Sequence, residues 1–347
     1  MQESRLLDLF CELVRIESPS FHEAPMAARC ADELRRLGFE VSFDDSAERV
    51  GSDTGNLVAH LPGTRTGHMV FSAHMDTVQP CAGIEPVVVD GVVRSAVESG
   101  SPRPDVTVLL TTCEEQHLLG SSALADGLLP AGAPCYVLDA DGAPGTIITG
   151  APCHWSLNAT FSGRAAHAGV CPEEGVSAIA MAAAAVSSMP LGRLDEATTA
   201  NVGFIEGGGA TNVVPDTCAL AGECRSLYAE RAEAQKEAMT EALEAAAARF
   251  GGAVSIEWTK SYDAVLFDEE DELVQAIVRA SRAAGLEPRF HRSGGGSDAN
   301  VLAARGVRPV TLGVGMAAFH SVDEHIAVDD LEGAARLVEA LIAEGAQ

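Results

Sequence analysis

Four apolar segments of the sequence each lead into a histidine or an acidic residue. In chain order they are residues 69–73 before His74, residues 106–112 before Cys113-Glu114-Glu115, residues 135–138 before Asp139, and residues 309–314 shortly before His320. Ligands of open α/β sheets gather at the carboxyl ends of the strands. If the four segments are strands, these side chains therefore converge. Imidazoles and carboxylates together favour Zn²⁺, with Co²⁺ or Mn²⁺ as alternatives.

Two short spacings within this set indicate how neighbouring residues could work together at a metal site. In His74-x-Asp76, the carboxylate can hold the second ring nitrogen of the imidazole and so fix its tautomer. Glu114 and Glu115 are neighbours at a strand end, where consecutive side chains point to opposite sides. One carboxylate can then bind a metal ion while the other acts as a base toward the substrate. Either spacing is also common where a strand ends in solvent, so the prediction of a metal site depends on all four segments ending alike.

The elements that must position these side chains follow two patterns. The outer parts of the chain alternate amphipathic helices with short apolar strands, which is typical of an α/β sheet covered on both faces. The helices are expected at residues 5–16, 24–37, 270–284 and 328–343, and the strands at 40–43, 56–61, 69–73, 106–112, 135–138 and 309–314. Residues 85–95 are expected to form a hairpin with Asp90-Gly91 at its turn.

The middle of the chain has a different order of elements. Its strands are expected at residues 153–163, 200–206, 217–226 and 253–259, and its helices at residues 176–189 and 228–250. This β-α-β-β-α-β order is that of a ferredoxin-like unit. We therefore predict an α/β domain formed by residues 1–152 and 263–347, with a second, α+β domain inserted at residues 153–262.

The composition argues against several partners and compartments. With 23 Lys and Arg against 50 Asp and Glu, the 347-residue chain has a formal net charge of −27. Nucleic acid and anionic membranes both favour positive charge, so we expect neither as a partner. No apolar run is long enough to span a membrane, and residues 1–17 lack the apolar core of a signal peptide. Nine scattered cysteines without a C-x-x-C pair indicate free thiols, and we expect a cytoplasmic protein.

Taken in order, the motifs resemble those of the dinuclear zinc peptidase family of peptidase T and carboxypeptidase G type, most closely its peptidase T-like branch. They are Ala73-His74-Met75-Asp76-Thr77-Val78, Thr112-Cys113-Glu114-Glu115, Val137-Leu138-Asp139, Ala165-Ala166-His167-Ala168-Gly169, Thr211-Asn212-Val213-Val214-Pro215, Glu223-Cys224-Arg225, Gly295-Gly296-Ser297-Asp298-Ala299-Asn300 and His320-Ser321. The resemblance spans nearly the whole chain. It implies an α/β zinc-peptidase-like catalytic domain, whose mixed central sheet is flanked by helices, and an inserted ferredoxin-like domain for lid formation and dimerisation.

The resemblance also implies a metal site with two zinc ions. His74 and Asp139 resemble the ligands of one metal, and Glu115 and His320 resemble the ligands of the other. Glu114 resembles the base that deprotonates the attacking water. The implied reaction is hydrolysis of a peptide bond, or a related amide bond, in small substrates.

The remaining motif residues resemble groups that orient the metal site and the substrate. Asp76 resembles the residue that orients His74. His167, on the inserted domain, resembles the histidine that stabilises the oxyanion, often across a homodimer. Asn212 and Arg225 resemble groups that hold the carbonyl and carboxylate of the substrate. Together these residues imply an aminopeptidase-like or tripeptidase-like enzyme.

The sequence departs from the family between the His74 and Glu114 motifs. The family has an aspartate there that bridges the two metals and opens a helix. Residues 94–105 contain neither that motif nor a helical pattern, since Pro102 and Pro104 oppose a helix. Because the crossover helix is missing, we expect one sheet face to lose its cover. Each metal would keep two protein ligands, where a catalytic zinc normally has three.

Several outcomes of this departure stay open. Glu98, Asp105 or Asp90 could replace the aspartate. One metal could instead be shared by His74, His320 and a carboxylate, or the site could be inactive. The printed sequence could also lack a segment of the natural chain. The alternatives to a peptidase are therefore a binding protein that retains the substrate pocket, and a mononuclear hydrolase of N-acyl amino acids.

Overall fold

The computed structural model describes residues 5–84, 86, 103–321 and 323–345. The chain divides into two compact units. The first comprises Met1–Gly150, Leu266–Ser293 and Ser297–Gln347, and the second comprises Ala151–Val265 and Gly294–Gly296. The hairpin expected at residues 85–95 lies outside the described residues, apart from Pro86.

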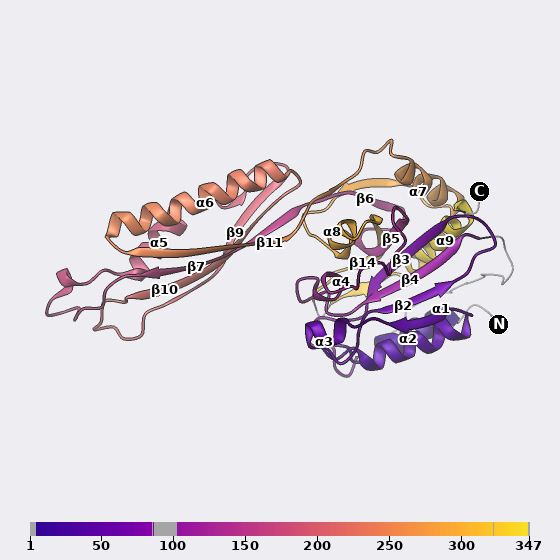
Figure 1. Ribbon diagram of the computed structural model, residues 1–347, viewed down its shortest axis with the longest axis horizontal. Coiled ribbons are helices and arrows are strands. Elements are labelled where there is room, and N and C mark those ends of the chain that lie inside the picture. The colour runs from indigo at the N-terminus through magenta and orange to yellow at the C-terminus, as the bar shows by residue number, and fades with distance from the viewer. Residues whose placement is uncertain (1–4, 85, 87–102, 322, 346–347) are drawn as a thin grey trace. The chain divides into compact units, whose positions relative to one another are not determined.

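The first unit is built around a mixed sheet (Figure 1). Its strands are β1 (Glu40–Phe43), β2 (Leu57–Leu61), β3 (His68–His74), β4 (Asp105–Thr111), β5 (Pro134–Asp141), β6 (Thr146–Ala151), β12 (Val265–Leu266), β13 (Arg289–Arg292), β14 (Arg308–Ala317) and β15 (His325–Ile326). The main order is β1-β2-β4-β3-β5-β14-β6-β12. The four central strands β4, β3, β5 and β14 are parallel, so their carboxyl ends meet at one edge.

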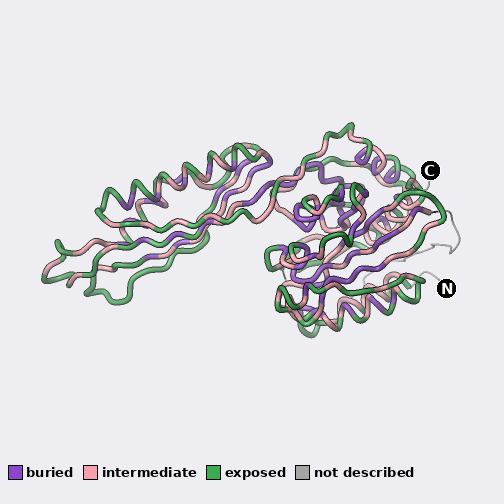
Figure 2. The backbone as a smooth tube through the Cα atoms, in the orientation of Figure 1, coloured by how far each residue is buried: buried purple, intermediate pink, exposed green. Residues whose placement is uncertain are grey.

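Helices cover both faces of this sheet. They are α1 (Arg5–Val14), α2 (Ala24–Arg36), α3 (Ser46–Val50), α4 (Leu119–Ser122), α7 (Glu272–Ala283), α8 (Asp298–Ala304) and α9 (Val328–Glu344). On one face, Phe71 packs in a core with Ile277 of α7 and Leu341 of α9. On the other face, Val70 packs in a core with Leu302 of α8. Neighbouring residues of β3 point to opposite faces, and Val70 and Phe71 are 0% and 6% exposed, so the expectation that one face would lose its cover is wrong. Figure 2 shows the buried backbone that runs through the middle of this unit.

The second unit is a five-stranded antiparallel sheet with two helices. Its elements are β7 (Cys153–Ser162), a 3₁₀ turn (Pro172–Glu174), α5 (Ala178–Ser188), β8 (Gly192–Arg193), β9 (Thr198–Gly207), β10 (Thr217–Ser226), α6 (Ala229–Phe250) and β11 (Ala253–Tyr262). The strand order β11-β7-β10-β9-β8 contains the ferredoxin-like arrangement in which the first and third strands are central. Phe161 of the sheet packs in one core with Met181 of α5 and Leu243 of α6. The predicted α/β fold with an inserted α+β unit is confirmed.

Three further observations bear on the sequence-based expectations. Helix α8 was not predicted; it is capped by Ser297, whose hydroxyl accepts the N–H of Ala299, while Asn300 completes a capping box. All nine cysteines are free thiols. Among the described residues, no helix has the length and apolar character needed to cross a membrane.

Candidate metal centre

The predicted donor residues lie together at the carboxyl edge of the first unit's sheet. His74 is the last residue of β3, Asp139 lies near the end of β5, and Glu114 and Glu115 follow β4. His74 Nε2 lies 3.6 Å from Asp139 Oδ1. His320 Nε2, after β14, lies 3.0 Å from Glu115 Oε1. These are the two pairs that the family resemblance assigned to two metals.

The spacing of the donor atoms suits a metal ion. With bonds of about 2.0–2.1 Å, two ligands of a tetrahedral zinc ion lie about 3.3 Å apart. The two pairs, at 3.6 and 3.0 Å, are close to that separation. One ligand atom from each of His74, Glu114 and Glu115 lies within 4.8 Å of the other two, so Glu114 joins the two pairs. The donor set therefore fits a divalent cation.

The electrostatics of the site indicate an excess of negative charge. Burial, together with the nearby carboxylates of Asp298, Asp139 and Glu115, raises the pKa of Glu114 to about 9, although His74 opposes this. Burial disfavours the charged form of His74, but the nearby carboxylates of Asp139 and Asp76 raise its pKa well above the ordinary value. Without a cation, the site thus retains protons to limit repulsion between carboxylates. A divalent cation would take the place of those protons.

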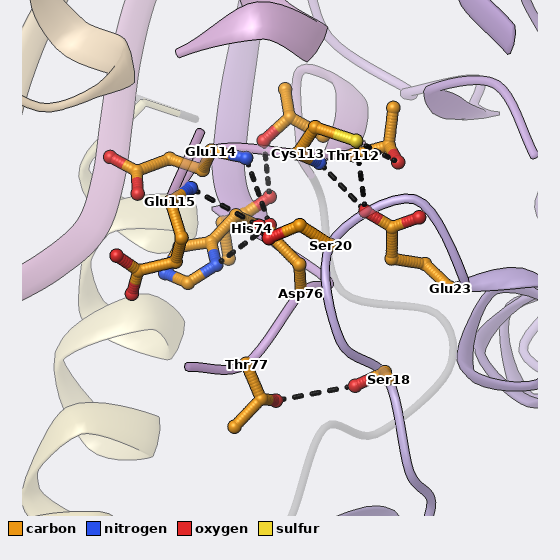
Figure 3. A network of polar contacts seen from close by, with 12 residues as sticks. Ser18, Ser20, Glu23, His74, Asp76, Thr77, Thr112, Cys113, Glu114 and Glu115 are labelled. Atoms are coloured by element: carbon orange, nitrogen blue, oxygen red, sulfur yellow. Dashed lines mark hydrogen bonds and ion pairs between the residues drawn. The ribbon is translucent and has the colours of Figure 1, made fainter. Parts of the chain in front are cut away.

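Asp76 connects His74 to the turn that carries the two glutamates (Figure 3). Its Oδ1 lies 3.3 Å from His74 Nδ1 and accepts the backbone N–H of Glu114 at 2.9 Å. Its Oδ2 accepts the N–H of Glu115 at 3.1 Å and the hydroxyl of Ser20 at 2.7 Å. Burial alone would raise the pKa of Asp76, but these partners hold it below the ordinary value. Asp76 therefore orients an imidazole and a loop at once.

The loops that carry the donors contain non-glycine residues in the left-handed region. Cys113 has φ 51°, directly before Glu114, and His117 and Leu118 have φ 60° and 61°. His320 itself has φ 59°. Such conformations are unfavourable for L-residues and cluster where the surroundings hold a functional group in place.

Burial raises the pKa of the Cys113 thiol to about 11, so this thiol stays protonated.

The other predicted site residues belong to the second unit. His167 and Asn212 lie on two exposed loops that pair with each other: the N–H of Ala168 donates to the carbonyl of Asn212 at 2.9 Å. His167 Nδ1 accepts the N–H of Gly169 at 3.2 Å. The structure therefore brings His167 and Asn212 together within this unit.

Arg225 is already paired with a carboxylate. Its Nε and Nη2 donate to the two oxygens of Glu223, at 2.9 and 2.8 Å. Glu223 Oε2 also lies 2.9 Å from Nε2 of the buried His154. These contacts, with His154 first, lower the pKa of Glu223 to about 2. Residues 223 and 225 share one face of a strand, so their pairing could have been expected from their spacing, whereas the contact with His154 could not.

The alternatives for the missing aspartate are partly resolved. Asp105 begins β4 and pairs with His68, whereas His74 pairs with Thr111 at the other end of the strand. At about 3.3 Å per residue, Asp105 is about 20 Å from the donor edge. The hypothesis that Asp105 takes the place of the missing aspartate is therefore wrong. Asp90 and Glu98 lie outside the described residues.

The structure adds one acidic residue that the sequence analysis did not assign. Asp298 begins α8, is 2% exposed and accepts the hydroxyl of Thr111, the last residue of β4. Its burial raises its pKa, and its charge acts on Glu114. The signal was present in the Gly295–Asn300 motif, but only the packing of α8 against the sheet brings Asp298 close enough to act on Glu114.

The chain is similar to known proteins over its full length. The chain is 38% identical to the uncharacterised protein YqjE of Bacillus subtilis, and all of both chains is covered. It is 38% identical to the aminopeptidase PepT from Bacillus cereus, whose crystal structure matches with a TM-score of 0.90 over 99% of each chain. The chain belongs to the dinuclear metallopeptidase family of peptidase T and carboxypeptidase G type.

Other members of the family support the same assignment. A tripeptidase from Staphylococcus aureus is 32% identical and matches with a TM-score of 0.93 over all of both chains. Residues 150–250 match the peptidase dimerisation domain family, and residues 56–143 match peptidase family M28. Membership makes the chain a metal-dependent hydrolase of the peptidase type.

Two comparisons bear on the departure from the family pattern. The alignment with the Bacillus subtilis protein has 371 positions and the chain has 347 residues, so at least 24 positions are gaps in this chain. A more distant relative, the succinyl-diaminopimelate desuccinylase of Acinetobacter baylyi, is 28% identical over 99% of both chains.

Proposed function

We propose that the chain is a zinc-dependent peptidase that cleaves small peptides, in the manner of an aminopeptidase or tripeptidase. The observation that carries this proposal is the pairing of His74 with Asp139 and of Glu115 with His320 around Glu114. The first pair would hold one cation and the second pair another. Zn²⁺ suits these mixed donors, and Co²⁺ or Mn²⁺ can take its place.

The residues at the site have distinct parts in the reaction. When bound, the cations supply polarisation of the scissile carbonyl and of the attacking water. Glu114 accepts a proton from that water and returns it to the leaving amine. Asp76 holds His74 and the Glu114–Glu115 turn in position. His167 of the second unit donates a hydrogen bond to the developing oxyanion.

We further propose that the first unit is the catalytic domain and that residues 153–262 form a lid and dimerisation domain. The match of residues 150–250 to the peptidase dimerisation domain supports a homodimer. Asn212 and Arg225 would hold the substrate carbonyl and carboxylate, since a guanidinium binds a carboxylate in two-pronged fashion. Arg225 already holds Glu223 in that way, so a substrate carboxylate would have to share or displace it.

Nine free cysteines support a cytoplasmic location.

A second candidate function is hydrolysis of N-acyl amino acids at a site with one metal ion. The desuccinylase similarity over nearly the whole chain favours an N-acyl substrate. The absence of the family's aspartate motif from residues 94–105 favours fewer metal ions. If no metal binds, a binding protein that retains the substrate pocket becomes the better description.

Metal content and substrate choice distinguish these functions. The chain, of verified intact mass, is loaded with Zn²⁺ and analysed for metal per chain. It is then offered tripeptides with a free amino terminus and N-succinyl amino acids of similar size. Two metal ions and cleavage of the tripeptides support the peptidase, and Glu114→Ala should abolish that cleavage while sparing metal binding. One ion with cleavage of the N-acyl substrates supports the second function, and absence of metal from the loaded chain contradicts both.

A further inference from the structure

Three consecutive backbone N–H groups at the glutamate turn donate to buried carboxylates. Those of Glu114 and Glu115 donate to Asp76, at 2.9 and 3.1 Å. The preceding N–H, that of Cys113, donates to Oε1 of Glu23 at 2.8 Å. Glu23 has no part in the chemistry described above, yet it contacts the residue next to Glu114.

Glu23 is held rigidly in this position. It is fully buried, and its backbone carbonyl accepts the N–H of Ala27 in the first turn of α2. Its Oε2 accepts the hydroxyl of Ser52 at 2.8 Å, and its Oε1 also accepts the thiol of Cys113 at 3.3 Å (Figure 3). A buried carboxylate is tolerated when it is hydrogen-bonded in this way. The contacts of its carboxylate join it to Ser52 and Cys113, which lie in two other segments of the chain. Glu23 therefore links three segments.

The residue that Glu23 holds has a backbone conformation that needs support. Cys113 has φ 51°, in the left-handed region that L-residues avoid. The next two N–H groups along the chain, those of Glu114 and Glu115, donate to Asp76. A conformation of this kind persists only where its surroundings over-determine it. The contacts from Glu23 to both the N–H and the thiol of Cys113 supply that constraint.

The segment that contains Glu23 also contacts Asp76, the second carboxylate that holds the glutamate turn. Ser20 donates its hydroxyl to Asp76 at 2.7 Å, and the carbonyl of Ser18 accepts the N–H of Thr77 at 2.8 Å. Residues 18–23 therefore contact the His74-x-Asp76 loop and the glutamate turn together. The two loops that carry donor residues are aligned through this segment.

We propose that Glu23 is a positioning residue of the metal centre, which holds the Cys113 amide and thereby fixes the turn that presents Glu114 and Glu115. The inference rests on the proposed function, because that function gives the turn its role in metal binding. The contact itself is independent of metal. No catalytic step is assigned to Glu23, since its carboxylate contacts Ser52 and Cys113 and not the donor atoms.

The test compares variants of Glu23 with a matched variant on the same helix. Glu33, near the other end of α2, is 8% exposed and bonded to Arg5, Arg29 and Arg36, so Glu33→Ala also removes a buried carboxylate. In chelator, amide hydrogen exchange is followed in a peptic fragment that contains residues 113–115. Zinc affinity is then measured by competition with a chromophoric chelator.

We expect Glu23→Ala to speed exchange at residues 113–115 and to weaken zinc binding by about 10–100-fold, as for other residues that support metal ligands. Glu23→Gln should stay close to the wild type, since its amide oxygen can still accept the Cys113 N–H. Glu23→Asp, one methylene shorter, should resemble Glu23→Ala, and it replaces that variant if Glu23→Ala fails to fold. Glu33→Ala should lower thermal stability without changing either measurement.

Unchanged exchange in both Glu23→Ala and Glu23→Asp would overturn the inference. Equal effects of Glu33→Ala on residues 113–115 would also overturn it, because the change would then reflect general destabilisation. Failure of the wild-type chain to bind zinc would instead contradict the proposed function. The exchange experiment, made without metal, would still decide the role of Glu23.

Discussion

Replacing Glu114 by Gln is expected to stabilise the metal-free protein at alkaline pH while abolishing turnover. Burial and the nearby carboxylates raise the pKa of Glu114 from an ordinary value of 4.5 to about 9. Between these pH values, the folded chain carries a proton that the unfolded chain has lost. The stability from this proton is fully present below pH 4.5 and is lost as the pH rises through about 9.

The expected size follows from proton linkage. One proton bound only in the folded state changes the free energy of unfolding by about 1.4 kcal/mol per pH unit, or about 2.7 kcal/mol from pH 6 to pH 8. Glu114 is only partly shielded from water, so we expect about 1.5–2.7 kcal/mol. For a unit of this size, that is roughly 3–10 °C in melting temperature. Gln resembles the neutral acid, so Glu114→Gln should lose the part of the pH dependence that Glu114 contributes. His74, whose pKa is also raised, contributes in the same direction in both proteins.

The assay must report on the first unit. Trp155 and Trp258 are the two tryptophans, and both belong to the second unit. Differential scanning calorimetry in chelator, at pH 6 and pH 8, is therefore preferable to fluorescence. Glu33→Gln is the control, because arginines hold the pKa of Glu33 below its ordinary value despite partial burial, so its charge does not change in this range. Equal pH dependence in the wild type and Glu114→Gln would refute the idea that the empty donor set carries surplus negative charge.

Three further predictions concern the aspartates around the site. Asp76→Asn keeps the shape but turns one acceptor oxygen into an N–H₂ group, so zinc affinity should fall about 10–100-fold in a chelator competition; unchanged affinity would show that Asp76 does not support the donors. Asp139→Asn should lower the metal content of the zinc-loaded chain by elemental analysis, and full content would remove Asp139 from the ligand set. Asp105→Asn should leave the metal content unchanged, because Asp105 begins β4 while the donors lie beyond its other end; a loss of metal there would contradict the site's location.

Much of the fold could be predicted because its patterns are local. The strand at residues 217–226 was predicted with the bounds that β10 has, and its buried residues Cys218, Leu220 and Cys224 follow the alternation of a strand. Helix α8 was missed because it is short and follows a glycine-rich loop, so its stability depends on burial of residues such as Leu302 rather than on periodicity. The hairpin expected at residues 85–95 falls almost entirely outside the described residues and stays a prediction.

By itself, the sequence determined which residues could act as donors, because an apolar strand that ends in His74, Glu115 or Asp139 carries its own signal. Only the tertiary structure decided which of them meet, since Glu115 and His320 are 205 residues apart in the chain. It also decided against Asp105, which the register of β3 with β4 places at the wrong edge. Glu23 could not be found from the sequence, because its partner Cys113 is 90 residues away and the contact depends on the folded path of both segments. Spacing along a chain reveals local geometry, whereas the contacts that align a site from distant segments exist only after folding.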